Sequence, residues 1–98
     1  MSFTGVREVY YKAGELRTSW FECNGVRDGE YKSFWPNGEL HSICNYINNK
    51  REGKYKYYDQ EYLKEEGYYK DDKRNGIRIE YFQNGNICCK FYFLLIKL

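Results

Sequence analysis

The sequence predicts an all-β protein, a single-layer twisted antiparallel sheet built from consecutive β-hairpins. Four glycines are spaced by 24, 24 and 23 residues, at Gly5, Gly29, Gly53 and Gly76. A pair of aromatic residues follows each of them, at Tyr10 and Tyr11, Phe34 and Trp35, Tyr57 and Tyr58, and Tyr81 and Phe82. No window places apolar residues at i, i+3, i+4 and i+7 over three turns, so helix is not expected.

A period of this length is typical of repeat architectures, in which each unit is one supersecondary element. The chain has 98 residues, enough for one domain and too few for two. We therefore predict a single repeat domain over residues 1–98, with repeats at approximately 5–28, 29–52, 53–75 and 76–98.

Each repeat is expected to hold two strands joined by a tight turn. The turn follows the aromatic pair, as at Pro36, Asn37 and Gly38, where Asn and Gly both accept positive φ. An aliphatic residue then recurs near the start of the second strand, at Leu16, Leu40, Leu63 and Ile87. The expected strands, in chain order, are 6–11, 16–22, 30–35, 40–46, 54–58, 63–69, 77–82 and 87–93.

The glycines fall into two structural turn series, Gly14, Gly38 and Gly85 in the tight turns, and Gly29, Gly53 and Gly76 at the starts of the second, third and fourth repeats. The second series ends the polar stretches 24–29, 48–53 and 71–76. These stretches are expected to be longer loops that join one hairpin to the next.

The third unit departs from the pattern. Its tight turn is one residue shorter, Glu61 replaces the turn glycine, and Arg78 stands where Tyr31 and Tyr55 stand in the preceding units. The hairpin itself is expected. Its register is left open, because a slip of one residue would exchange the two faces of the strand.

Aromatic residues make up 20% of the chain, and twelve of them are Tyr, so stacked rings are expected to supply the core. A one-layer sheet cannot bury both of its faces, and the adjacent aromatic pairs place a ring on each side. We therefore predict that one face binds another protein or a second copy of the chain. The residues assigned to this protein-binding surface are Trp35, Tyr31, Tyr55, Tyr57, Tyr58, Phe91, Phe93 and Leu95.

The apolar run at 91–96 has two competing interpretations. It can close the array as a cap folded over the aromatic face, or it can pair with the sheet of a partner.

These features resemble the MORN repeat (membrane occupation and recognition nexus), in the degenerate variant of bacterial antitoxin-like and large DNA virus proteins. The clearest copy runs from Trp35, Pro36, Asn37, Gly38, Glu39 and Leu40 through Tyr46, Asn49, Lys50 and Gly53 to Tyr55, Tyr57 and Tyr58. The resemblance implies a MORN-like array of hairpins with no catalytic residues, and a role in scaffolding, dimerisation or membrane association. The abundance of Lys, Asn, Tyr and Ile would also suit an AT-rich viral or bacterial genome.

Arg27, Arg51 and Arg74 lie two residues before the loop glycines and are expected to form a ladder on one rim of the sheet. Planar guanidinium groups can bind phosphates or carboxylates through paired donors, which makes these residues the candidate anion or lipid site. The alternative is a solvated loop, because Asp28 and Glu52 neighbour two of the three arginines.

Other classes of function find little support in the sequence. A net charge of +2, from 16 basic and 14 acidic residues, gives no reason to expect nucleic acid. His41 is the only imidazole, and no catalytic or phosphate-binding motif is present, so we expect no enzyme, no small-molecule substrate, no cofactor and no metal.

The location is predicted as cytoplasmic. No apolar run reaches the ~20 residues that span a bilayer, and the N-terminus lacks the pattern of a secretion signal. Cys23, Cys44, Cys88 and Cys89 are accordingly expected to be reduced.

The sequence thus predicts a non-enzymatic interaction or scaffold module that binds a protein partner or forms a homodimer through its aromatic face. The alternatives are an adaptor for anionic, phosphoinositide-type membrane surfaces that uses the arginines, and an antitoxin-like neutraliser of a protein partner, which the resemblance alone implies.

Overall fold

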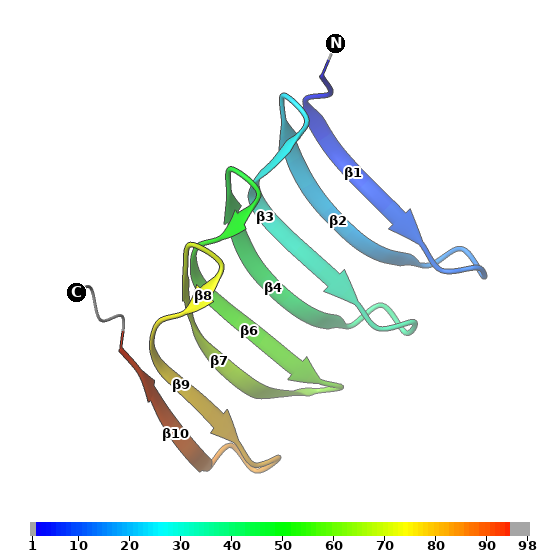
Figure 1. The fold of residues 1–98 in the computed structure, drawn as a ribbon. Helices are drawn as coiled ribbons and strands as arrows, with labels where there is room; N and C mark the ends of the chain where they lie inside the picture. The colour runs from blue at the N-terminus through cyan, green and yellow to red at the C-terminus, as the bar shows by residue number, and fades with distance from the viewer. Residues whose placement is uncertain (1, 95–98) are drawn as a thin grey trace.

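The computed structural model describes residues 2–94, and these residues form one open antiparallel sheet without a helix (Figure 1). The molecule measures 42 × 42 × 14 Å, and the short dimension agrees with a single layer of strands. The predicted all-β, single-layer fold is therefore confirmed. Its strands are β1 (Gly5–Tyr10), β2 (Leu16–Cys23), β3 (Val26–Phe34), β4 (Leu40–Ile47), β5 (Lys50–Arg51), β6 (Gly53–Asp59), β7 (Tyr62–Lys70), β8 (Lys73–Arg74), β9 (Gly76–Tyr81) and β10 (Ile87–Phe93).

The strands follow one another across the sheet in chain order. The path is β1-β2-β3-β4-β6-β7-β9-β10, while the two-residue strands β5 and β8 pair with β4 and β7. The two ends of the chain consequently lie at opposite ends of the array (Figure 1). Strands β1 and β10 are its edges.

The four hairpins have the same register. Near each tight turn an aromatic residue pairs with the recurring aliphatic one: Tyr10 with Leu16, Phe34 with Leu40, Tyr58 with Leu63 and Tyr81 with Ile87. Each of these pairs is preceded by a β-bulge, in which two residues of the second strand oppose one residue of the first. The bulge leaves one residue per hairpin outside the pairing, namely Arg17, His41, Lys64 or Cys88.

The glycine-containing tight turns differ in detail from the prediction. In the second hairpin only Gly38 of the three loop residues has positive φ, 91°, so the expectation that Asn37 shares it was wrong. The Gly38 N–H donates to the Trp35 carbonyl at 2.9 Å, and the Trp35 N–H donates to the Glu39 carbonyl at 2.8 Å. Asn37 instead accepts the Glu39 N–H on its side-chain oxygen at 2.9 Å. This is a three-residue loop that ends in a left-handed glycine.

The predicted longer loops between hairpins are also wrong. The connections are two-residue turns with positive φ at both positions: Asn24 and Gly25 at 52° and 82°, Asn48 and Asn49 at 52° and 71°, and Asp71 and Asp72 at 49° and 69°. Asn and Asp accept this left-handed conformation, and its twist matches that of the flanking strands. Gly29, Gly53 and Gly76 lie beyond these turns, at φ of 128°, 81° and 73°, in β3 and at the starts of β6 and β9.

The short third hairpin keeps the common register. Asp59 pairs with Tyr62 around the two-residue loop of Gln60 and Glu61. Tyr57 pairs with Glu65 just as Ser33 pairs with Ser42 one repeat earlier. The third hairpin is therefore one residue shorter only in its turn, and its strand residues keep the same faces as in the other hairpins.

Burial is concentrated in the middle of the sheet. Among the described residues, the hydrophobic side chains classed as buried are Tyr55, 2% exposed, and Tyr69, 6% exposed. The Tyr55 ring lies over Gly67, its partner in register: a Cβ atom at Gly67 would lie 2.8 Å from Cε1 of the ring. Larger apolar side chains near both edges remain exposed, including Val6, Tyr10, Ile87 and Tyr92.

Candidate interaction surface

One face of the sheet carries most of the aromatic contacts, and we call it the aromatic face. Residues that alternate along a strand share a face, so Tyr55 and Tyr57 of β6 lie together, with their centroids 5.3 Å apart. The aromatic face consists of Trp20, Tyr31, Trp35, His41, Tyr46, Tyr55, Tyr57 and Tyr69.

The rings form two neighbouring clusters. In the first, Tyr31 lies 5.7 Å from Trp20 and 5.6 Å from Tyr46. In the second, Tyr55 lies 4.8 Å from Tyr69. Such offset and tilted pairs contribute about 0.5–1.5 kcal/mol each beyond the burial of their area.

The three ladder arginines extend over these rings. Arg27 lies 4.9 Å from the centroid of Trp20 and 5.5 Å from those of Tyr31 and Tyr46. Arg51 lies 4.2 Å from Tyr69, and Arg74 lies 5.9 Å from the same ring. Cation–π attraction therefore places all three cations against the aromatic face.

Two of these arginines have acidic partners. Arg51 donates to Asp72 at 2.6 Å, and this contact lowers the pKa of the Asp72 carboxyl. Arg74 lies 3.2 Å from a Glu65 oxygen and donates to the Tyr55 hydroxyl at 2.9 Å. The Tyr55 hydroxyl in turn donates to Glu65 at 2.6 Å.

Arg27 differs from the other two. The residue equivalent to Asp72 is Asn49, whose side-chain oxygen accepts the backbone N–H of Arg27 at 2.7 Å and supplies no charge. Glu22 opposes Arg27 in register but bonds Arg7 at 2.5 Å. Within the part of the chain that the structure describes, Arg27 forms no ion pair. Among the three ladder arginines, Arg27 is therefore the one without an acidic partner in the described part of the chain.

Burial affects the ionisation of the central tyrosines. It raises the pKa of Tyr57 to about 12. It also raises the pKa of Tyr55, with a further contribution from the hydrogen bond to Glu65. Both phenols consequently stay neutral at physiological pH, and the Tyr55 hydroxyl donates to Glu65 while it accepts from Arg74.

Two depressions lie on either side of the Trp35 indole and the His41 ring, whose centroids are 4.6 Å apart and perpendicular. One has a volume of about 430 Å³ and the other about 260 Å³. The buried Trp35 Nε1 has no hydrogen-bond acceptor among the described residues. The larger depression is lined by Trp35, His41, Tyr57, Tyr58, Asp59, Lys64 and Glu65, and the smaller by Tyr11, Arg17, Thr18, Ser33, Phe34, Trp35 and His41.

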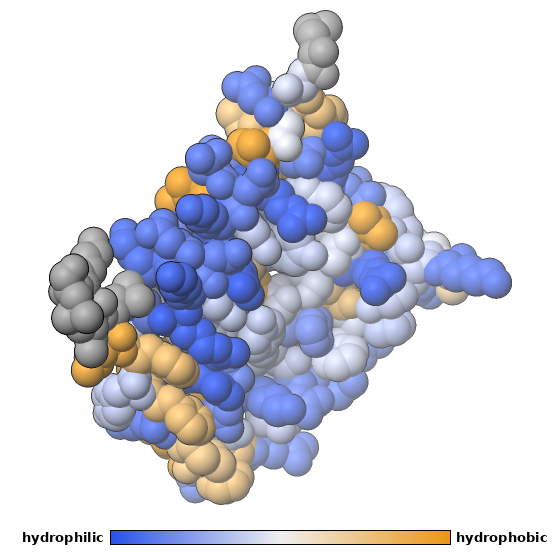
Figure 2. Space-filling model, viewed as in Figure 1, coloured by the Kyte–Doolittle hydropathy of each residue, from blue (hydrophilic) through white to orange (hydrophobic). Residues whose placement is uncertain are grey.

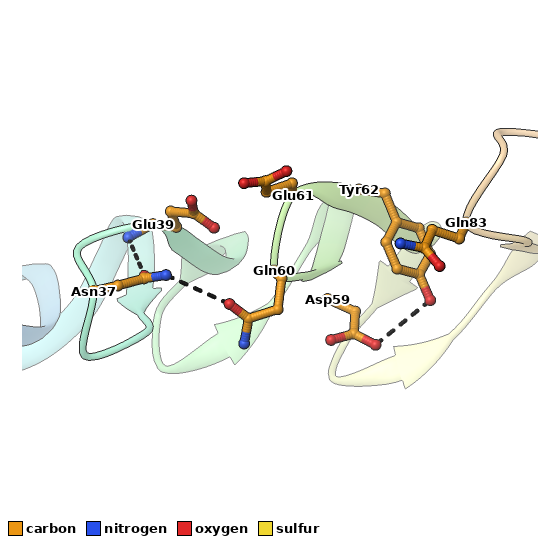
Figure 3. A pocket seen from close by; sticks show the side chains of 7 residues that line it. All are labelled: Asn37, Glu39, Asp59, Gln60, Glu61, Tyr62 and Gln83. Atoms are coloured by element: carbon orange, nitrogen blue, oxygen red, sulfur yellow. Dashed lines mark hydrogen bonds between the residues drawn. The ribbon is translucent and has the colours of Figure 1, made fainter.

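A third depression follows the tight turns and is polar (Figure 3). It holds Asn37, whose amide donates to Gln60 at 3.4 Å, and the carboxylates of Glu39, Asp59 and Glu61. No group of three or more His, Cys, Asp or Glu side chains placed to hold a metal ion occurs within residues 2–94.

The residues predicted to bind protein do not all lie together. Trp35, Tyr31, Tyr55 and Tyr57 are on the aromatic face, but Tyr55 is almost completely buried and offers little contact area. Tyr58 faces the other side, beside Leu40 and Ile43 in a depression of about 330 Å³.

Phe91 and Phe93 of the last strand lie on the same side of the sheet as the aromatic face, because Phe93 pairs with Gly76 just as Tyr69 pairs with Gly53. Arg78 lies 4.7 Å from the ring of Phe91, and Phe93 pairs with Gly76. Leu95 and residues 95–96 of the apolar run lie outside the described residues. Apolar atoms gather at this C-terminal end of the molecule, while polar residues cover much of the middle (Figure 2).

Sequence reasoning missed four members of the aromatic face, Trp20, His41, Tyr46 and Tyr69. For Tyr46 and Tyr69 a signal existed, because their spacing of 23 residues follows the repeat. For His41 no signal existed, because only the bulge turns it toward Trp35.

Comparison with known proteins supports the repeat assignment. The family model described as MORN repeat variant matches residues 27–48 and 74–94. The first match covers β3 and β4, and the second covers β9 and β10. No curated protein and no solved structure matches the chain.

Proposed function

We propose that the aromatic face docks a protein partner or a second copy of the chain. Two segments of the chain match the MORN repeat variant, a non-enzymatic module that mediates protein or membrane interactions. The observation that carries the proposal is that a sheet rich in aromatic rings buries only Tyr55 and Tyr69 among its described hydrophobic side chains. The half-exposed rings of Trp20, Tyr31 and Trp35 remain available for contact.

Arg27 gives the surface a preference for a particular kind of partner. Three rings hold its guanidinium in place, and it lacks the carboxylate that Arg51 has in Asp72. A partner segment that offers an Asp or Glu side chain beside an apolar residue would supply this missing contact. A bidentate arginine–carboxylate pair also fixes orientation as well as adding affinity.

The arrangement favours a protein partner over an anionic membrane. Arg51 and Arg74 are already paired with Asp72 and Glu65, so the ladder presents one unpaired cation rather than three. Binding to an anionic surface gains about 1 kcal/mol per basic residue near it, so a single free arginine contributes little. No helix in the described part of the chain is long and apolar enough to cross a membrane.

We further propose that the protein works in the reducing cytoplasm, where its four free cysteines would persist.

The test is affinity capture of partners from the native source with the full chain, in three forms: wild type, Arg27→Gln and Arg51→Gln. Light scattering on the purified proteins reports self-association in parallel. A specific protein, or the chain itself, is expected to bind wild type and Arg51→Gln and to be lost with Arg27→Gln. Melting temperatures show that the variants are folded.

Two results would contradict the proposal. One is equal binding by all three folded forms. The other is binding only to anionic vesicles that fades as salt rises, because that outcome assigns the surface to lipid headgroups.

A further inference from the structure

The last strand carries two adjacent thiols on the same side of the sheet. The Sγ atoms of Cys88 and Cys89 in β10 lie 3.1 Å apart. Neighbouring residues in a regular strand point to opposite faces, which would separate the two sulfurs widely. The bulge removes this alternation, because Glu80 pairs with Cys89 and Tyr81 pairs with Ile87, so that Cys88 is skipped.

The second hairpin shows that this convergence is a property of the bulge. There the skipped residue is His41 and the next residue is Ser42. Both reach the hydroxyl of Ser33, which lies 3.0 Å from His41 Nδ1 and 2.5 Å from the Ser42 Oγ. At the fourth bulge the same backbone geometry holds two sulfurs.

The pair is accessible to solvent. Cys88 is exposed and Cys89 is half-buried, on an edge strand that pairs only with β9 among the described elements. The other two cysteines, Cys23 and Cys44, are single half-buried thiols on β2 and β4. Burial raises the pKa of the Cys44 thiol, and the contact with Cys89 raises the pKa of Cys88, so exposure and the neighbouring sulfur are what distinguish the pair.

We propose that Cys88 and Cys89 form a redox-labile vicinal dithiol, whose reaction partners are low-molecular-weight disulfides. One cysteine sulfur attacks such a disulfide, forms a mixed disulfide and releases one small thiol. The neighbouring sulfur then attacks the cysteine sulfur of the mixed disulfide and releases the second small thiol. The two cysteines are oxidised to one disulfide, the reagent is reduced to two thiols, and the two cysteine protons leave with the products.

The ring formed in this way is easily reduced. Adjacent Cα atoms are about 3.8 Å apart across a trans peptide, which is shorter than the usual ~4.4–6.8 Å of disulfide-linked residues. Strain of this kind raises the reduction potential and makes a disulfide labile. The site is therefore suited to reversible oxidation in a reducing compartment, where lasting disulfides are rare.

The test is incubation of the full chain with oxidised glutathione, followed by acid quenching and mass spectrometry of the intact protein and of the peptide that holds residues 88 and 89. Wild type is expected to lose two hydrogens in this peptide and to retain no glutathione there. The single variants Cys88→Ser and Cys89→Ser keep one thiol each, and are expected to retain glutathione because no neighbour displaces it. Dithiothreitol should restore both wild type and variants.

A second reagent tests the pairing without oxidation. Phenylarsine oxide binds two thiols with release of water, so one equivalent is expected to bind wild type at this peptide and to be lost from either single variant. Circular dichroism establishes that the variants are folded. A stable glutathione adduct on the wild-type peptide, an unreactive peptide, or arsenic binding that survives in a single variant would each overturn the proposal.

Discussion

Tyr55 and Gly67 illustrate how single residues determine the packing of a one-layer sheet. The two residues oppose each other on β6 and β7, and the ring occupies the space that a side chain at Gly67 would need. Tyr55 is thereby buried without a second layer, and its hydroxyl still reaches Glu65 at 2.6 Å. Glycine lowers the stability of a strand, but here the ring covers the exposed backbone.

We predict that Gly67→Ala destabilises the fold by about 1–3 kcal/mol, the typical cost of overpacking. The added Cβ would lie 2.8 Å from Cε1 and 2.9 Å from the hydroxyl oxygen of Tyr55, so the ring must move away from Glu65. Urea unfolding of the variant measures the change in free energy.

The control is the same substitution in a Tyr55→Ala background, where no ring remains to clash. There the cost of Gly67→Ala should largely disappear, because the two effects are coupled. Equal costs in the two backgrounds would contradict the steric explanation.

Sequence reasoning recovered some residues and missed others for identifiable reasons. The equivalence of Arg78 with Tyr31 and Tyr55 was visible from the spacing, and Arg78 does lie in β9 at the matching place, opposite Phe91. Gly67 falls in neither of the two glycine series, and its role depends on a ring from another strand. No local pattern carries that information.

At the scale of elements, the connections between hairpins tie neighbouring repeats together. The backbone N–H of Asn49 donates to the Arg27 carbonyl at 2.9 Å, and that of Asp72 donates to the Arg51 carbonyl at 3.0 Å. The side-chain oxygens of Asn49 and Asp72 accept the N–H groups of the same two arginines. These two turns therefore each form a pair of hydrogen bonds with the preceding repeat.

Asn49 separates two contributions of such a turn, its left-handed backbone and its side-chain acceptor. Asn49→Gly keeps the backbone freedom at φ of 71° and loses the acceptor for Arg27. Asn49→Ala loses both. We predict that the alanine variant is less stable than the glycine variant by about 1–2 kcal/mol, the cost of a left-handed conformation with a Cβ atom.

Chemical denaturation of the two variants gives this difference directly. Equal stabilities would show that the turn readily adopts another conformation.

The sequence predicted that hairpins would occur but assigned the wrong type of turn to each end of them. A glycine is conspicuous in a sequence, whereas the Asn48-Asn49 and Asp71-Asp72 pairs adopt left-handed backbone through their own side-chain chemistry.

At the scale of the whole molecule, stability is distributed unevenly along the array. Each hairpin contacts only its neighbours, as in other repeat proteins. The two buried tyrosines lie in the central strands β6 and β7, while β1 and β10 carry exposed Val6 and Tyr92.

We predict that backbone amide hydrogen exchange is slowest in β6 and β7 and fastest in β1 and β10, because the edges open without breaking the central contacts. Hydrogen exchange followed by mass spectrometry or NMR measures this order. Uniform protection along the chain would mean that the array unfolds only as one cooperative unit.

The overall architecture was the most predictable feature, since regular spacing alone determines a row of hairpins. The interaction surface was less predictable, because it depends on which strands bring rings together. Trp35 and Tyr57 were identified in advance. The hydrogen bond between Arg27 and Asn49 could be located only once the pairing of β3, β4 and β5 was known.

The recurring bulge has a consequence for how such an array diversifies. Arg17, His41, Lys64 and Cys88 occupy equivalent places, yet they are a guanidinium, an imidazole, an amine and a thiol. The residue at this place has no partner in the strand register of any of the four hairpins, so strand pairing does not restrict which side chain it carries. New chemistry can be introduced there, one repeat at a time, while the sheet that supports it stays the same.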